Sequence, residues 1–212
     1  MMSFRSRYFG LPLAAVLMVS PLSAGASENW GTPYDKLFEE AGDRVKHSKT
    51  RNGTEIREFL TKGGVQILQE RKDGKVSTST LDMQHGPVLC FWEIAVSVRA
   101  ALDTCEETKR PKLAARLDTA IGKLNRFIAA NALEKATEEQ MQAIMTQRML
   151  SFRQSQSAPE TGRVSCAKSG PKALTFFNAY LNDLAKKSDE DYQAGIDKLL
   201  SVPRLPAMNP CL

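Results

Sequence analysis

The sequence predicts an α+β fold that is mostly helical: an N-terminal helix and a three-stranded antiparallel β-meander, followed by a disulfide-clipped bundle of about five helices. Three observations lead to this prediction. Glycine turn signals divide a stretch rich in β-branched residues, apolar residues recur at helical spacing from residue 88 onward, and four cysteines lie between positions 90 and 211. A chain of 212 residues with 42% hydrophobic content can bury a core of its own.

The first 26 residues have the composition of a secretory signal peptide. Arg5 and Arg7 give a basic start, an apolar run covers Tyr8 to Val19, and small residues precede Ser27. The apolar run is too short to cross ~30 Å of hydrocarbon as a helix. We therefore expect cleavage before Ser27, no stable membrane anchor afterwards, and a periplasmic or secreted protein that consists of residues 27–212 as a single exported domain.

Export changes the net charge that bears on partners. The whole chain has a formal charge of +5, but residues 27–212 carry about +3, because both leader arginines are lost and the leader holds no acid. So small a surplus, spread among mixed signs, leaves no electrostatic footprint for DNA or RNA. We therefore predict no nucleic-acid partner.

A helix is predicted over residues 32–46. Thr32 suits the N-cap, Pro33 suits the first helical position, and Asp35 completes a variant of the capping box. Apolar residues then follow at helical spacing: Tyr34, Leu37, Phe38, Ala41 and Val45. We expect a surface helix with one apolar face.

A β-meander is predicted over residues 54–82. Turn signals of the Asn-Gly, Gly-Gly and Asp-Gly types bound three predicted strands, which are residues 54–61, 64–71 and 75–82. Short connections predict antiparallel neighbours. Ile56 and Ile67 suggest a covered face, whereas Arg57 and Gln69 suggest a face toward water, so we expect a one-sided sheet that needs a helix on its apolar face.

Helical periodicity dominates residues 88–201, which predicts the bundle. Five helices are expected, from Val88 to Cys105, from Pro111 to about Ala132, from Thr137 to about Gln154, from Ser169 and from Ser188. A capping box opens the third of these helices at Thr137–Gln140, and Ser188–Asp191 caps the last one. The polar stretch 155–165, which contains a proline and a glycine, is predicted to be a loop.

Cys90, Cys105, Cys166 and Cys211 all lie in the exported part, where disulfides are the default. Cys90 and Cys105 sit at the two ends of one predicted helix, ~22 Å apart, which is too far for a disulfide. Two connectivities remain: 90–211 with 105–166, or 90–166 with 105–211, and we favour the first. A disulfide at Cys211 would fasten the proline-rich tail, residues 202–212, across the helices.

The sequence contains no signature of catalysis, of a cofactor or of a metal site. Patterns of the C-x-x-C, H-E-x-x-H and G-x-S-x-G types are absent, as are the phosphate-binding glycine patterns. The histidines number two, His47 and His85, which is a poor supply of ligands and general bases. We therefore predict a protein without cofactor or metal, and we favour a non-enzymatic function over an enzymatic one.

Three functions are considered. The first is a non-enzymatic protein that binds an envelope or secreted protein, for example an envelope factor, an inhibitor or a toxin-neutralising protein. Its candidate contacts are Trp30 and the stripe Met141, Met145 and Met149, because methionine suits adaptable surfaces, although helices also bury such stripes in a core. The alternatives are a cell-envelope hydrolase that uses a carboxylate pair and a small-ligand-binding periplasmic protein with a cavity of at least ~300 Å³ between sheet and helices.

Overall fold

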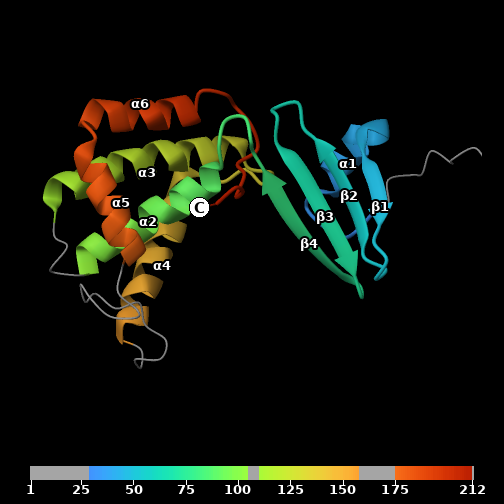
Figure 1. The fold of residues 1–212 in the computed structure, drawn as a ribbon, viewed down its shortest axis with the longest axis horizontal. Coiled ribbons are helices and arrows are strands. Elements are labelled where there is room, and N and C mark those ends of the chain that lie inside the picture. Colours follow the sequence, from blue (N-terminus) through green and yellow to red (C-terminus); the bar gives the residue numbers. More distant parts are fainter. Residues whose placement is uncertain (1–28, 105–109, 158–174, 212) are drawn as a thin grey trace, which may run out of the picture.

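The computed structural model describes residues 29–104, 110–157 and 175–211 of the chain. Figure 1 shows a β-sheet that projects from one end of a bundle of helices, with the C-terminal segment passing between the two. The sheet and the bundle each have an apolar cluster of their own. In the described ranges, no helix combines the length and apolar content that crossing a membrane requires.

The first helix is shorter than predicted. Helix α1 spans Asp35–Ala41, and the 3-10 helix η1 spans Gly42–Arg44. The backbone N–H of Thr32 donates to the Asp35 carboxylate over 2.9 Å, as the predicted capping box requires, but the N-cap residue is Tyr34, so the prediction of Thr32 as N-cap and Pro33 as first helical residue is wrong. Helix α1 ends at Gly42, whose φ of 52° lies in the left-handed region that glycine adopts at low cost.

The chain then forms a fourth strand, β1, over Lys46–Lys49, so the predictions of three strands and of a helix to residue 46 are wrong. The turn at Asn52-Gly53 joins two strands and therefore needs one before it as well as one after it. Gly53 donates to the Thr50 carbonyl over 3.0 Å and has a φ of 85°, as in a three-residue hairpin loop. All four residues of β1 are polar and exposed, so no apolar alternation marks the strand in the sequence.

The rest of the predicted meander is confirmed. Its strands are β2 at Glu55–Leu60, β3 at Gln66–Lys72 and β4 at Lys75–Leu81, and the sheet is antiparallel in the order β1-β2-β3-β4. Asp73 and Gly74 connect β3 to β4 with φ values of 51° and 74°. Two consecutive positive φ values are the type I′ geometry that the Asp-Gly pair favours.

Helix α1 covers one face of the sheet, and this face is partly polar. Phe38 packs against Phe59, with ring centroids 4.9 Å apart, beside the buried Ile67. Arg57 and Gln69 lie on the same face and are 1% and 0% exposed, so the expectation that they face water is wrong. Because side chains alternate along a strand, the burial of Arg57 places its neighbour Ile56 on the opposite face.

The bundle has the five helices that the sequence predicts: α2 at Val88–Thr104, α3 at Pro111–Asn131, α4 at Glu138–Ser157, α5 at Thr175–Lys186 and α6 at Asp189–Leu199. Both predicted caps form. Thr137 and Gln140 exchange hydrogen bonds of 2.8 and 3.2 Å, and the Ser188 hydroxyl accepts from the Asp191 N–H over 3.0 Å. Helix α4 extends into the predicted loop, whose remainder lies outside the described residues.

Residues 202–211, which we name the C-terminal strap, lie between sheet and bundle (Figure 1). Asn209 forms a parallel bridge with Leu81 at the end of β4. On the other side, the Leu89 N–H at the start of α2 donates to the Ala207 carbonyl over 2.9 Å. The strap therefore bonds to both parts of the molecule.

A disulfide closes the end of the strap. Cys90 of α2 is bonded to Cys211, with Cα atoms 5.4 Å apart and a sequence separation of 121. This confirms the pairing that we favoured for these two cysteines. Cys105 and Cys166 lie outside the described residues.

Candidate functional site

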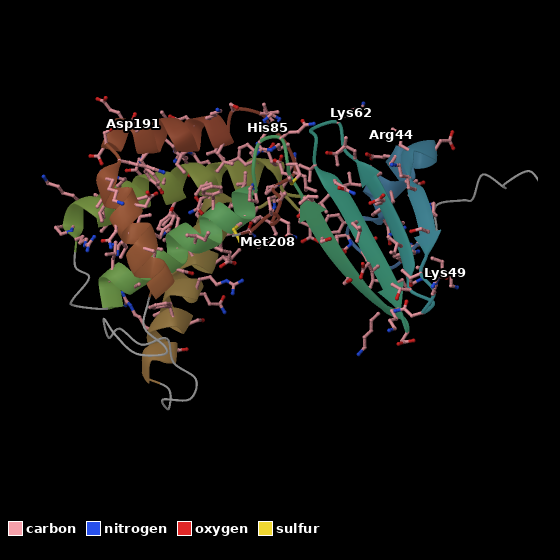
Figure 2. The ribbon with its side chains drawn as sticks, viewed as in Figure 1. Arg44, Lys49, Lys62, His85, Asp191 and Met208 are labelled. Atoms are coloured by element: carbon pink, nitrogen blue, oxygen red, sulfur yellow. A yellow bond between two sulfur atoms is a disulfide. The ribbon has the colours of Figure 1, made fainter. Side chains whose placement is uncertain are left out.

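Strand β1 forms one edge of the sheet. Within the described ranges it pairs with β2 alone, so its other side is a free edge. Figure 2 places Lys49 on the part of the sheet remote from the junction at which His85 and Met208 lie. The opposite edge is partly covered, because Asn209 donates to the Thr80 carbonyl and accepts from the Asp82 N–H. Of the two edges, that of β1 is the one left unpaired along its whole length in the described part of the chain.

The backbone groups of β1 alternate between β2 and the free edge, as in any antiparallel ladder. Thr50 donates to the Thr54 carbonyl over 2.9 Å, so its backbone groups point toward β2. Two residues earlier, Ser48 points the same way. His47 and Lys49 have the opposite parity, so they direct their N–H and C=O groups to the free edge.

The ladder between β2 and β3 agrees with this assignment. Thr61 donates to the Val65 carbonyl over 2.9 Å, so alternate residues of β2 counted from Thr61, Arg57 among them, direct their backbone groups toward β3. Arg57 lies opposite His47 in the pairing of β1 with β2. The backbone groups of Arg57 bond to β3. His47 and Arg57 therefore lie opposite each other without exchanging backbone hydrogen bonds.

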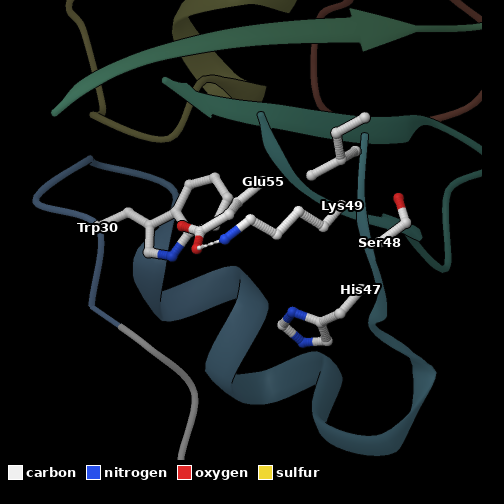
Figure 3. Close-up of a pocket in the computed structure, with 6 residues that line it drawn as sticks. Trp30, His47, Ser48, Lys49 and Glu55 are labelled. Carbon is white, nitrogen blue, oxygen red and sulfur yellow. Dashed lines mark hydrogen bonds and ion pairs between the residues drawn. The ribbon is translucent and has the colours of Figure 1, made fainter. Parts of the chain in front are cut away.

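A pocket of about 370 Å³ lies beside the same strand, lined by Trp30, His47, Ser48, Lys49, Glu55 and Ile56. Figure 3 shows the side chains of Lys49 and Glu55 meeting next to the Trp30 ring, with His47 nearby. The Lys49 ammonium lies 3.4 Å from the Glu55 carboxylate. The residues that offer backbone groups at the free edge therefore also offer side chains to the pocket.

Two arginine side chains contact the indole ring of Trp30. The guanidinium carbons of Arg57 and Arg71 lie 4.4 and 4.6 Å from the centre of a Trp30 ring, and Trp30 is only 8% exposed. Arg71 also pairs with Glu55 over 2.6 Å. Hydrogen bonds from Arg71 and then Lys49 hold the pKa of Glu55 below its usual value, so this carboxyl is ionised near neutral pH.

The strand beside the pocket is basic. Residues 44–51 contain four Lys and Arg residues and no Asp or Glu. In the described part of the chain, Lys46 and Arg51 form no ion pair. The charge of the strand itself is therefore positive, and the acids nearest to it in the sheet are Glu55 and Glu58, which lie opposite Lys49 and Lys46 on β2.

The residues proposed from the sequence as partner contacts lie in two places. Met141 is buried, and Met145 and Met149 are half-buried against the helical core, so this stripe packs inside the bundle. Trp30 lines the pocket. Sequence reasoning missed His47 and Lys49, although a polar run directly before an Asn-Gly turn could have indicated an edge strand.

The site contains no recognisable catalytic set. Side-chain alternation places His47 and Ser48 on opposite faces of β1, so this histidine cannot act as a base for this serine. Throughout the described ranges, no cluster of three His, Cys, Asp or Glu side chains could hold a metal ion. Comparisons with protein-family models, curated protein sequences and solved structures find no match for this chain. What the geometry can do is bind an extended segment through backbone groups and a neighbouring pocket.

Proposed function

We propose that this is an exported, non-enzymatic protein that binds another protein by adding one of its strands to the free edge of β1. The observation that carries the proposal is that His47 and Lys49 combine outward backbone groups with side chains that line a pocket. In strand addition, backbone hydrogen bonds supply affinity, and pockets for alternate side chains supply selectivity.

The architecture supports this role. The sheet extends away from the bundle, and its β1 edge lies farthest from the strap (Figure 1). The strap and the disulfide fasten the other end of the sheet, so the bundle provides a fixed base for it. A partner could therefore reach β1 without contacting the bundle.

Export is part of the proposal. The leader-like first 26 residues support it, and so does the bond between Cys90 and Cys211, because disulfides persist in oxidising compartments. We propose that the partner is an envelope or secreted protein and that the protein acts in the periplasm or outside the cell.

Site-specific crosslinking in the producing cells tests the proposal. A photo-crosslinking amino acid at Lys46 should capture one protein, identified by mass spectrometry, whereas the same amino acid at Lys198 of α6 should not. His47→Pro should abolish the capture, because proline removes an outward N–H and obstructs the edge while leaving the ladder to β2 intact. Equal capture from α6, or capture that survives His47→Pro in a folded protein, would overturn the proposal.

Small-ligand binding is the second candidate function, and the observation that favours it is the pocket. Its volume of about 370 Å³ exceeds the ~300 Å³ at which ligand pockets begin. It lies at the free edge of the sheet, however, and not between sheet and helices as expected. A thermal-shift screen of small anionic and aromatic compounds separates the two functions: a ligand that stabilises the wild type and the His47→Pro variant equally favours this alternative.

A further inference from the structure

We infer that the segment added at β1 is acidic, with Asp or Glu at alternate positions that face His47 and Lys49. This inference rests on the proposed function, because it specifies the chemistry of the partner at that same edge. Three features of the site indicate such a partner: the direction of the β1 backbone groups, the charge of the strand and the ion pairs of Glu55.

The direction of the backbone groups sets which partner residues face the pocket. An antiparallel strand would exchange hydrogen bonds with His47 and Lys49, so two of its residues would lie directly opposite them. Directly opposite residues project their side chains onto the same face, with Cβ atoms about 5 Å apart. Ser48 alone lies between His47 and Lys49, so one residue also lies between the two facing residues of the partner.

The charge of β1 argues against a second copy of this chain as the occupant. Antiparallel pairing of two β1 strands would bring lysines and a histidine of one copy against those of the other. Like charges directly opposite are destabilising, and lysines on edge strands discourage pairing between copies. Opposite charges across the same positions are favourable, so the basic edge selects a different, acidic chain.

The ion pairs of the pocket leave Lys49 available to such a partner. Glu55 lies 2.6 Å from a nitrogen of Arg71 but 3.4 Å from the Lys49 ammonium. When a carboxylate of the partner forms an ion pair with Lys49, Arg71 still compensates the negative charge of Glu55. The Lys49 side chain is 63% exposed, so its ammonium can turn to the new partner.

Titration of the isotope-labelled protein with short synthetic peptides, followed by nuclear magnetic resonance, tests the inference. The probe is a seven-residue peptide with blocked ends, Glu at alternate positions, and Val or Thr between them. Its isosteric control replaces each Glu with Gln, and a third peptide is N-methylated at the amides that would bond to β1. We expect the acidic peptide to shift the amide signals of His47 and Lys49 and to bind about tenfold more tightly than the Gln peptide at low salt.

A matched pair of variants locates the effect. Lys49→Gln should remove most of the preference for the acidic peptide, whereas Lys75→Gln, the same change at an exposed residue of β4, should leave it unchanged. Thermal unfolding of both variants verifies that they are folded.

The possible outcomes separate the inference from the proposed function. If the Gln peptide binds as tightly as the acidic one and N-methylation abolishes both, strand addition stands and the acidic preference is wrong. If the acidic peptide binds regardless of N-methylation, charge alone explains binding and strand addition is wrong. If it binds equally to both variants, Lys49 does not select the acidic side chains and the inference is wrong. If no peptide shifts the β1 signals at millimolar concentration, both are overturned.

Discussion

Asp82 and Arg204 form an ion pair in which neither side chain is exposed to solvent, although 122 residues separate them in the chain. Arg204 also donates to the carbonyls of Leu199 and Gly86, over 3.0 and 3.1 Å. Asp82 accepts from the backbone N–H of His85 over 2.8 Å. The pair therefore joins the end of β4 to the strap and to the bundle, which fixes how the sheet is mounted.

Removing the cation of this pair should destabilise the protein strongly. We expect Arg204→Met to lower the free energy of unfolding by about 3–5 kcal/mol, because the Asp82 carboxylate is left buried without compensation. Arg99→Met is the control, since Arg99 pairs with Asp118, whose side chain is 55% exposed, and should lose less than about 1 kcal/mol. Urea unfolding measures both, and equal losses would contradict the prediction.

The same pair predicts a loss of stability in acid. Burial alone would raise the pKa of Asp82, but the His85 N–H and the Arg204 guanidinium together hold it below the ordinary 3.8. A carboxyl with a lowered folded-state pKa stabilises the fold fully above its unfolded value and loses that contribution as pH falls through the folded value.

We therefore expect the free energy of unfolding to decrease from about pH 4 downward. Asp82→Asn should lower stability at pH 7 and should flatten this acid decrease. Asp43→Asn, at an exposed residue of η1, should change neither. Urea unfolding at a series of pH values measures both effects, and an unchanged acid slope in Asp82→Asn would show that other carboxyls cause the decrease.

The disulfide predicts a separate loss. We expect Cys211→Ser to lower the free energy of unfolding by about 2–4 kcal/mol, because the bond to Cys90 closes a long loop in the unfolded chain. A Cys90→Ser/Cys211→Ser double variant should be no less stable than the single variant. Urea unfolding measures these losses, and mass spectrometry of the unreduced protein checks that the wild type has no free thiol at either position. An unchanged stability of Cys211→Ser would mean that the strap is held by its other contacts.

The elements that the sequence predicted well are those with local signals. Helices α2 to α6 have apolar residues at helical spacing, and Thr137 and Ser188 cap α4 and α6 as expected. Strand β1 has no local signal, because its pairing with β2 is satisfied by backbone groups and its side chains are all polar and exposed. A strand without apolar residues is therefore seen only through the hairpin turn that follows it.

Ile67 is buried as the sequence predicts, but Arg57 and Gln69 show why the polar residues of this face are assigned wrongly. Sequence patterns treat arginine and glutamine as exposed residues, and most of them are. The burial of this pair depends on Trp30, Asp35 and Thr78, which come from three separate segments. The pocket itself also combines separate segments. The sequence therefore indicates Trp30 as a candidate contact but not His47 and Lys49, which complete the pocket.

Two glycines predict opposite effects of the same substitution. A Cβ on Gly63 would lie 2.8 Å from the Cβ of Arg204, whereas a Cβ on Gly195 in α6 would meet nothing within 4 Å. We expect Gly63→Ala to destabilise the protein and Gly195→Ala to stabilise it by about 0.5–1 kcal/mol, because alanine restricts the unfolded chain and favours helix. Thermal unfolding measures both, and effects of equal sign would show that the loop before β3 moves away from Arg204.

The guanidinium of Arg57 packs against Trp30, which lines the pocket of the candidate site. It lies between the rings of Trp30 and Phe38, at 4.4 and 4.1 Å from their centres. Two of its nitrogens donate to the Gln69 side chain over 2.9 and 2.6 Å, and it pairs with Asp35. A planar, delocalised cation can stack on two rings and keep these bonds, which an ammonium cannot.

Arg57→Lys should therefore lower the free energy of unfolding by about 2–3 kcal/mol, through lost stacking and through the hydrogen bonds that Gln69 and Asp35 lose. Arg44→Lys is the matched control, because Arg44 is exposed, lies 5.9 Å from the Phe59 ring and makes one backbone hydrogen bond. Its loss should stay below about 1 kcal/mol. Urea unfolding measures both, and similar losses would mean that the buried guanidinium contributes no more than a surface one.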